Sequence, residues 1–285
     1  MPFDVDGDGL LDFIAARAVK PLTPLTPPAG ELVWLRQPAV AQPFAPASLP
    51  WKEGVLRSGA WAPDVGFTPP VSIRGDGDEQ IYFTSFFTGG GLAMLQCSGC
   101  AGAGGSATWA TASLTLTVLD ASLGPAFDVA VVDLNGDGVR DLLVTNHADN
   151  ATAPAHTASQ VVAYVAPPPG SALTDASAWG RHVLAEGFLI REPGPNQASP
   201  GEASALLLPG GAAKPLVLVS GDGEQRWTIL EPASSDPSDW GYTRTEILDC
   251  GGTTGKQASL TVAGVAYVLL PCYDAGTVHA FRVEA

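Results

Sequence analysis

The chain has few basic residues, and this shortage narrows the partners that it can bind. Lysine and arginine together number 14 among 285 residues, against 29 aspartates and glutamates, so the formal net charge is −15. Proteins that bind nucleic acid draw much of their affinity from clustered lysine and arginine side chains. The composition therefore argues against a nucleic-acid partner. It favours an acidic surface, part of which can be gathered in cation sites.

Long apolar runs are also missing. No segment approaches the roughly 20 apolar residues that cross a bilayer as a helix, so no membrane span is expected. Residues 1–4 lack the basic start and the apolar core of a secretory signal peptide. We expect a soluble mature chain whose export signal, if it has one, lies outside this sequence.

No stretch keeps a 3.6-residue apolar period long enough to predict a long helix. Glycine and proline are frequent instead, with 33 and 25 residues, and they follow no collagen-like period. This combination predicts many short elements joined by turns. Because 46% of the residues are hydrophobic, the chain can still build a core, and the fold class is predicted to be all-β.

Cysteines are few, and they leave three readings open. Cys97 and Cys100 have the spacing of half a zinc site or of a redox motif, but Cys250 and Cys272 are 22 residues apart and do not repeat it. A thioredoxin-like motif needs a helix start in a βαβ unit, and none is visible. Two disulfides in an exported protein, buried thiols, or a zinc site remain. The sequence does not fix the pairing.

Two nine-residue segments, 4–12 and 133–141, carry oxygen-bearing side chains at positions 1, 3, 5 and 9 and glycine at position 6. A sharp turn there requires a positive φ, and this ladder of oxygens is typical of a calcium loop. Position 7 would add its backbone carbonyl. The expected ligands are Asp4, Asp6, Asp8, Leu10 and Asp12 in the first loop, and Asp133, Asn135, Asp137, Val139 and Asp141 in the second.

An EF-hand has a similar ladder, but it needs a glutamate at position 12 and a helix on each side. Position 12 is Ala15 in the first loop and Val144 in the second, and each stands inside a β-like run. The sequence therefore excludes the EF-hand, and the carboxylate at position 9 is expected to close each loop.

One short phrase returns four times, starting at Val55, Val118, Val183 and Ile247, about 64 residues apart. A tryptophan precedes every copy. A constant period of this length indicates an array of supersecondary units and is too long for leucine-rich or ankyrin repeats. The tryptophans are Trp51, Trp109, Trp179 and Trp240.

The third repeat shows four expected strands, at residues 127–132, 142–146, 161–165 and 180–185. Four short antiparallel strands, repeated around an axis, describe the blade of a β-propeller. We predict one domain, 1–285, of about five blades. Both a closed five-bladed ring and a fragment of a larger propeller agree with a short first strand and a missing last one. The expected blades are 1–60, 61–124, 125–188, 198–251 and 252–285.

With the motif D-x-[DN]-x-D-G-x-x-D between two strands, the chain resembles the FG-GAP or VCBS repeats of integrin α-subunit propellers, of a fungal propeller lectin and of many secreted microbial proteins. The third and fourth strands are also similar to those of the aldos-2-ulose dehydratase propeller. The resemblance implies a structural calcium ion between the first two strands of a blade.

The other repeats depart from the motif. In the second, the aligned positions are Ser72, Arg74, Asp76, Asp78 and Gln80, where Arg74 could place its guanidinium in the position of the ion. Residues 209–214 and 263–264 replace the loop in the fourth and fifth repeats. We therefore predict two calcium ions.

Nothing in the sequence demands an enzyme. Among the histidines, His147 is the best catalytic candidate, and acid pairs such as Glu202 with Asp222 cannot be placed at catalytic distance from sequence alone. The favoured hypothesis is an extracellular, calcium-stabilised module that binds a glycan or a protein through the long loops 21–30, 96–107, 148–159 and 190–201. Its candidate contact aromatics are Trp61, Phe87, Trp227 and Tyr273.

The alternative is a carbohydrate-active lyase or dehydratase, or its propeller portion, and it rests on the resemblance to the dehydratase propeller. Oligomeric state does not follow from the sequence.

Overall fold

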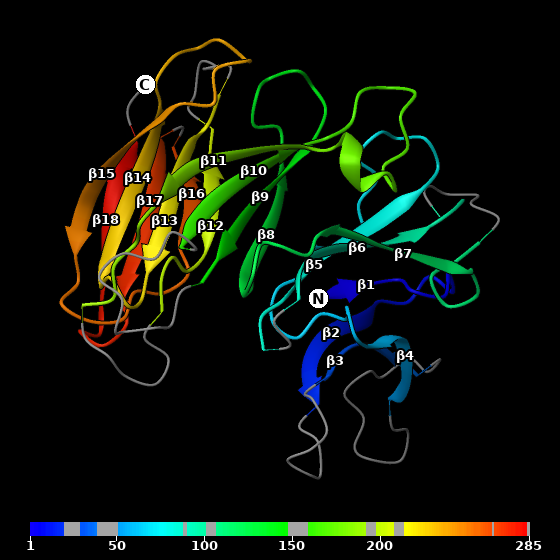
Figure 1. Ribbon diagram of the computed structural model, residues 1–285. Coiled ribbons are helices and arrows are strands. Elements are labelled where there is room, and N and C mark those ends of the chain that lie inside the picture. Colours follow the sequence, from blue (N-terminus) through cyan, green and yellow to red (C-terminus); the bar gives the residue numbers. More distant parts are fainter. Residues whose placement is uncertain are drawn as a thin grey trace. The chain divides into compact units, whose positions relative to one another are not determined.

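The computed structural model describes residues 1–19, 29–38, 51–87, 90–100, 107–147, 159–191, 198–207, 214–263 and 265–283. Within them the chain is all-β, as predicted. The 3₁₀ turn η1 (Ala176–Ala178) is the one helical element described there, and no helix in this part of the chain is long and apolar enough to span a membrane. The strands form five separate antiparallel sheets (Figure 1). Closure of these sheets into a propeller remains a prediction.

The first compact unit, Met1–Pro125, holds two sheets. The first sheet has the order β1-β2-β3-β4 and the second β5-β6-β7. Their strands are β1 (Pro2–Phe3), β2 (Asp12–Val19), β3 (Ala29–Arg36), β4 (Lys52–Gly59), β5 (Glu79–Ser85), β6 (Gly91–Cys97) and β7 (Leu114–Asp120).

The second unit, Ala126–Ala285, holds three sheets. The third sheet contains β8 to β11 and the fourth β12 to β15, each in sequence order, while the fifth contains only β16, β17 and β18. Their strands are β8 (Ala126–Val132), β9 (Asp141–Asn146), β10 (Gln160–Val165), β11 (Gly180–Glu186), β12 (Ala203–Leu206), β13 (Leu216–Gly221), β14 (Arg226–Pro232), β15 (Tyr242–Asp249), β16 (Ala258–Val262), β17 (Val265–Cys272) and β18 (Thr277–Val283).

Burial follows the composition of the strands. The middle strands β6, β9 and β13 have runs of three or four apolar residues at their centres and are buried on both faces, as expected for strands covered on both sides. The fourth strands β11 and β15 alternate exposed and less exposed residues, as expected for half-buried strands. One core cluster in the second unit joins the third and fourth sheets, and another joins the fourth and fifth.

The repeated sequence phrase has a structural cause. In each of the first four sheets the pairing between the last two strands contains a β-bulge at this phrase, where one residue of the last strand is left without a partner. The extra residues are Leu56, Leu119, Leu184 and Ile247. The recurrence of an aliphatic residue at this place therefore marks a bulge that adds a side chain to the packing between sheets.

The second sheet differs from the prediction. Four strands were expected in each repeat, but before β5 the residues Phe67 and Val71 form only isolated bridges, to Phe83 and Gln80. Two prolines, Pro69 and Pro70, stand between these bridges. Proline has no amide hydrogen to donate to a ladder, so the pairing is interrupted. The short first strand of the first sheet and the three-stranded fifth sheet were both anticipated.

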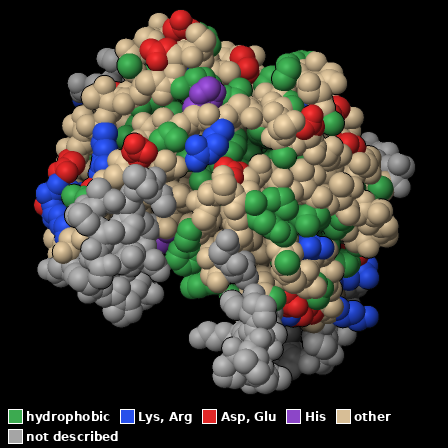
Figure 2. Space-filling view, viewed as in Figure 1, with side chains coloured by type: hydrophobic (Ala, Val, Ile, Leu, Met, Phe, Trp, Pro, Cys, Tyr) green, Lys and Arg blue, Asp and Glu red, His purple; other side chains and the backbone are tan. Residues whose placement is uncertain are grey.

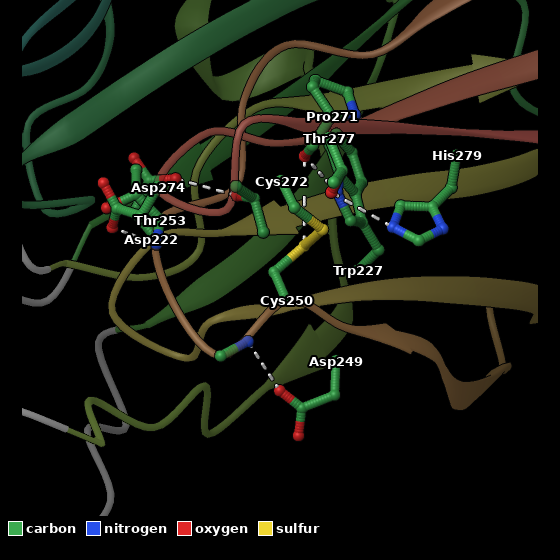
Figure 3. The surroundings of a disulfide bond; sticks show 12 residues. Asp222, Trp227, Asp249, Cys250, Thr253, Pro271, Cys272, Asp274, Thr277 and His279 are labelled. Atoms are coloured by element: carbon green, nitrogen blue, oxygen red, sulfur yellow. Dashed lines mark hydrogen bonds between the residues drawn. A yellow bond between two sulfur atoms is a disulfide. The ribbon is translucent and has the colours of Figure 1, made fainter.

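All four cysteines form disulfides, Cys97–Cys100 in the first unit and Cys250–Cys272 in the second. A four-cysteine zinc site is therefore excluded, because no thiolate remains free. Cys250 directly follows β15 and Cys272 is the last residue of β17, so the bond between them (Figure 3) ties the fourth sheet to the fifth. Beside it the indole of Trp227 donates a hydrogen bond of 3.0 Å to the Pro271 carbonyl.

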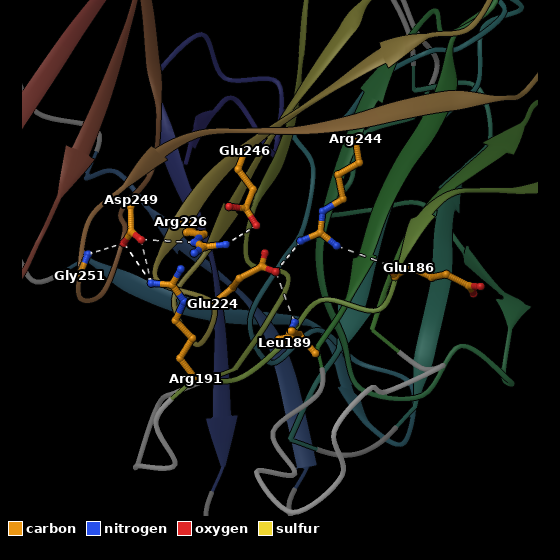
Figure 4. Close-up of polar contacts among 9 residues, drawn as sticks. All are labelled: Glu186, Leu189, Arg191, Glu224, Arg226, Arg244, Glu246, Asp249 and Gly251. Atoms are coloured by element: carbon orange, nitrogen blue, oxygen red, sulfur yellow. Dashed lines mark hydrogen bonds and ion pairs between the residues drawn. The ribbon is translucent and has the colours of Figure 1, made fainter.

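An ion-pair network crosses the fourth sheet (Figure 4). Arg226 pairs with Glu246 and Asp249, and Arg191 pairs with Asp249 at 3.0 Å. Arg244 pairs with the buried Glu224. The network fastens the connection between β11 and β12 to the strands of the fourth sheet.

The loops expected to bind partners lie in large part outside the described residues, at 20–28, 101–106, 148–158 and 192–197. On the face drawn in Figure 2, acidic and basic side chains are scattered among neutral ones, and hydrophobic side chains form several separate patches.

Candidate metal centre

The two acidic loops occupy equivalent places and have the same backbone. Residues 4–12 join β1 to β2, and residues 133–141 join β8 to β9. Position 4 has φ of 76° at Gly7 and 77° at Gly136, and position 6 has φ of 82° at both Gly9 and Gly138. Only glycine adopts such angles without strain, so the two glycines of the motif are explained by the turn itself.

In the first loop each acidic side chain accepts hydrogen bonds from the amides that follow it. Asp4 accepts from the amides of Gly7 (2.8 Å) and Gly9 (2.9 Å). Asp6 accepts from the amide of Asp8 at 3.3 Å, and Asp8 accepts from that of Leu10 at 2.9 Å. These bonds curl the loop around its own carboxylates, which therefore converge.

The second loop repeats this pattern bond for bond. Asp133 accepts from the amides of Gly136 (2.7 Å) and Gly138 (2.9 Å). Asn135 accepts from the amide of Asp137 at 3.0 Å, and Asp137 accepts from that of Val139 at 2.7 Å. Two segments more than a hundred residues apart thus present the same set of oxygen atoms.

Position 9 anchors each loop to its sheet. Asp12 and Asp141 are fully buried. Asp141 accepts from the amide of Leu134 inside the loop and from that of Ala166 beyond β10, both at 3.0 Å. Burial raises the pKa of Asp141 to about 6; the two amides oppose this shift, and the neighbouring aspartates add to it.

Asp12 makes the corresponding contacts in the first sheet. Its carboxylate accepts from the amides of Val5 (3.2 Å) and Gln37 (2.7 Å) and from the indole of Trp34 (2.8 Å). Position 9 therefore joins its loop to the end of the third strand in both sheets. The sequence motif did not disclose this role, because the partners lie about 25 residues downstream.

The charges around the two loops differ. Carboxylate oxygens of Asp4, Asp6 and Asp8 lie within 4.8 Å of one another, and Arg36 lies against them, 2.6 Å from Asp6 and 3.3 Å from Asp8. Burial and the charge of Asp8 raise the pKa of Asp6, while Arg36 opposes them. By strand register, the position of Arg36 is occupied by Val165 in the third sheet.

Residues 72–80 of the second sheet supply an internal comparison. Ser72 accepts from the amide of Gly75 at 3.0 Å, and Asp76 accepts from that of Asp78 at 3.4 Å. The fully buried Gln80 replaces the aspartate of position 9 and accepts from the amide of Ile73 at 3.5 Å. This loop keeps the bonds to positions 1, 5 and 9 from the amides of positions 4, 7 and 2 with few acids, so the backbone turn alone does not demonstrate a metal site.

A buried lysine stands two residues before β13 in the fourth sheet. The loop residues 208–213 lie outside the part of the chain that the structure describes, but Lys214 is described, and it is buried. Its ammonium donates to the carbonyls of Asp236 (3.0 Å) and Asp239 and lies 5.6 Å from the ring centre of Trp240. A fixed positive charge thus braces the connection between β14 and β15. The sequence analysis did not predict a role for this lysine. The one sequence feature that could have indicated it is a charged residue next to an apolar strand.

The donor set suits a hard divalent cation. Each full loop offers side-chain oxygens at positions 1, 3, 5 and 9 and no nitrogen or sulfur ligand, apart from the amide nitrogen of Asn135, which is turned toward Asp137. Oxygen ligands from alternating positions are those that calcium prefers. The residues present therefore fit calcium, with Arg36 as a competing cation in the first loop.

The remaining candidates fall in different places. His147 is buried, stacks on Phe127 with ring centres 4.1 Å apart and contacts the Pro200 carbonyl at 2.5 Å through Nδ1. Trp227 is fully buried and is not a contact platform, which corrects that prediction. Phe87 and Tyr273 are exposed.

A second polar cluster lies at the start of the inner strands of the second unit. Asp128 pairs in register with Thr145, and Glu202 takes the same place opposite Ser220. The Lys256 ammonium is 3.8 Å from Glu202. Burial raises the pKa of both acids and Lys256 opposes it; the charge of Asp128 raises that of Glu202 further. The acids Glu202 and Asp222, which the sequence could not place relative to each other, have different partners. Glu202 is grouped with Asp128, and Asp222 accepts a hydrogen bond from Thr254.

A comparison of the chain with known proteins found no protein-family model that matches it and no curated protein that matches it significantly.

Proposed function

We propose that the protein is an extracellular binding module of the β-propeller type, in which two calcium ions brace the loops 4–12 and 133–141. The observation that carries this proposal is the identical hydrogen-bond skeleton of two distant loops that both keep oxygen donors at all four side-chain positions. The sister loop 72–80 has the same turn and lacks most of these acids, so the turn can form without them. Retention of the full acidic set in two loops favours an ion.

Calcium should raise the thermal stability of the protein. A ligand that binds only the folded state at a hundred times its Kd stabilises it by about 2.7 kcal/mol per site. Differential scanning calorimetry with calcium or with a chelator measures this shift. Asp137→Asn keeps the acceptor for the Val139 amide and removes one charge, so it should reduce the calcium-dependent shift.

Asp76→Asn is the matched control, because Asp76 holds position 5 in the sister loop. It should leave the calcium-dependent shift unchanged. Equal melting temperatures with calcium and with chelator would show that the two acidic loops are empty turns.

The ligand of the module is proposed to be a glycan or a protein that contacts the loops between the strands. The two disulfides agree with an extracellular setting. Glycan-array binding in calcium and in chelator tests this part of the proposal. If Asp137→Asn reduces both the calcium-dependent shift in melting temperature and glycan binding, recognition of the glycan depends on the ion.

A carbohydrate-active enzyme is the second candidate. The cluster of Asp128, Glu202 and Lys256 favours it, because it groups two acids whose pKa values burial raises with a lysine, and such groups are the usual carriers of acid–base catalysis. Turnover of a sugar substrate that is abolished by Glu202→Gln, together with an absence of glycan binding, would replace the binding module by this enzyme.

A further inference from the structure

The two disulfides differ in what they join. Cys250–Cys272 connects two sheets, whereas Cys97 and Cys100 are three residues apart and close only a turn at the end of β6. A cross-link over so short a loop removes less entropy from the unfolded chain than one over a long loop. The bond between Cys97 and Cys100 is therefore the weaker of the two as a structural brace.

The sister sheets show that this place in a repeat does not need a disulfide. The strands β3, β6 and β10 correspond, because each pairs with the strand that leaves the loop. Counting from position 9 of each loop, the place of Cys97 is taken by Gln37 in the first sheet and by Ala166 in the third. Both sheets form without a bond there, so the architecture of the repeat does not explain the two cysteines.

The two sulfur atoms differ in their access to solvent. Cys97 is 0% exposed and belongs to a core cluster of the first unit, while Cys100 is half-buried and packs against the same cluster. Ser98, between them, is exposed. A thiol in solution can therefore approach Cys100 and not Cys97. Exposed disulfides are the ones that exchange with thiols most readily.

A carboxyl group stands opposite the buried sulfur. Glu79 of β5 pairs in register with Cys97, so the two side chains lie on the same face of the sheet with Cβ atoms about 4.5–5.5 Å apart. The indole of Trp109, in the same core cluster as Cys97, donates a hydrogen bond of 2.7 Å to Glu79. Burial raises the pKa of Glu79, and the indole opposes this shift. The carboxyl group is thus held beside the sulfur and takes up a proton more readily than an exposed one.

This acid accompanies the cysteines within the chain. Glu79 is position 8 of its loop, and the residues at position 8 of the two acidic loops are Leu11 and Arg140. The second sheet therefore departs from its sisters at the two cysteines and at the acid together. Such a joint departure is expected when the three side chains take part in one reaction.

We propose that Cys97 and Cys100 form a redox centre that exchanges its disulfide with small thiols, and that Glu79 is the acid of this reaction. A thiolate attacks the Cys100 sulfur, the S–S bond breaks, and its electron pair passes to Cys97. Glu79 gives its proton to the Cys97 thiolate and regains one from solvent.

A second thiolate then attacks the sulfur of the thiol bound to Cys100. The small disulfide leaves, and Cys100 becomes a thiolate that takes a proton from solvent. Two small thiols are thus oxidised to one disulfide while the protein disulfide is reduced to two thiols, and the reverse steps restore it. The centre is separate from the loops 4–12 and 133–141, so the proposal is independent of the function proposed above.

Turnover of a small disulfide tests the proposal. The full chain, at a concentration far below that of the substrates, should accelerate the reduction of eosin-labelled glutathione disulfide by dithiothreitol. In glutathione buffers, alkylation followed by mass spectrometry should show Cys97–Cys100 reduced at a value of [GSH]²/[GSSG] about tenfold lower than Cys250–Cys272, because of the shorter loop. Absence of turnover, or reduction of both bonds at the same ratio, would overturn the proposal.

Glu79→Gln tests the role of the acid. The amide oxygen still accepts the hydrogen bond from Trp109, but the side chain has no proton to give to Cys97. The rate of turnover should fall more than about tenfold, because a positioned acid contributes about 10²–10⁴ in rate. The glutathione ratio that reduces Cys97–Cys100 should stay the same, since an acid changes the rate and not the equilibrium. Glu31→Gln, which removes a partner of Arg17 in the first sheet, is the control and should leave the rate unchanged.

Single-cysteine variants show which sulfur is attacked. Cys97→Ser leaves the half-buried Cys100, which should form a mixed disulfide with oxidised glutathione. Cys100→Ser leaves the buried Cys97, which should form it more than about tenfold more slowly. Circular dichroism confirms that both variants are folded. Equal rates for the two variants, or an unchanged rate of turnover in Glu79→Gln, would contradict the proposed reaction.

Discussion

At the residue scale, the difference between the two acidic loops lies in one side chain. Arg36 holds its guanidinium on Asp6 and Asp8 in the first loop, while the third sheet has Val165 at that position. A cation entering the first loop must displace or share these carboxylates with the arginine. The two loops should therefore bind calcium with different affinities although their backbones agree.

Arg36→Gln should strengthen calcium binding by the first loop. The ion pair is partly exposed, and such pairs are worth about 0.2–1 kcal/mol, so the expected gain is roughly 1.4- to fivefold in Kd. Isothermal titration calorimetry, fitted with two sites, measures it. Arg17→Gln is the control, because Arg17 pairs with Glu31 and Glu53 in the same sheet. An unchanged Kd would mean that breaking the ion pairs of Arg36 with Asp6 and Asp8 costs no measurable free energy.

Lys214 is the second residue whose role rests on charge. Lys214→Met keeps much of the volume and removes the donor from the carbonyls of Asp236 and Asp239. Hydrogen bonds from a charged donor contribute about 1.5–3 kcal/mol, so the free energy of unfolding should fall by about this amount. Urea denaturation measures it, with the exposed Lys52→Met as a control that should change stability little. A stability equal to that of the wild type would show that water replaces the ammonium.

At the scale of elements, the sequence predicted the strands well wherever a repeat could be compared with its sisters. The four strands of the third sheet were placed within a residue or two, because glycine and proline bound each apolar run. The bulges were not predicted. The repeated phrase shows where a feature recurs in the sequence, but only the strand pairing shows which residue is left without a partner. Pro69 and Pro70 interrupt the pairing where the order of strands in the other repeats predicted a first strand for the second sheet.

The acidic loops were predictable for a similar reason: the spacing of aspartates and glycines encodes the whole turn. The contacts of Asp12 with Gln37 and of Asp141 with Ala166 were not, because they join residues that only the sheet brings together. The same holds for Arg36 and Lys214. Local signals thus gave the centre of the candidate site, and the surrounding charges had to come from the structure.

The disulfide between Cys250 and Cys272 should hold the fifth sheet on the fourth. Replacing both cysteines by serine removes a cross-link between residues 22 apart, which is worth about 3 kcal/mol by loop-closure entropy. The buried Trp227 lies at this junction, so its fluorescence in a urea titration should report an earlier transition.

The serine replacements of Cys97 and Cys100 are the control for this experiment. These cysteines are only three residues apart, so the expected loss is smaller, about 2 kcal/mol. A larger loss for this pair would contradict the entropic account.

At the scale of the whole molecule, each compact unit contains one complete acidic loop. Calcium should therefore slow hydrogen exchange both in β1 to β3 and in β8 to β10, the strands that each loop and its position 9 join. Asp137→Asn should remove this protection in the second unit and leave that of the first. Mass spectrometry of the exchanged peptides separates the two. Loss of protection in both units would mean that they respond to calcium as one body.

The loop at residues 72–80 has a bearing on how such a chain can diverge. Serine, arginine and glutamine stand there at positions 1, 3 and 9, and the turn still forms. The turn at this place in a repeat therefore does not depend on a full set of acids, so a repeat can lack the proposed ion site and still keep the turn.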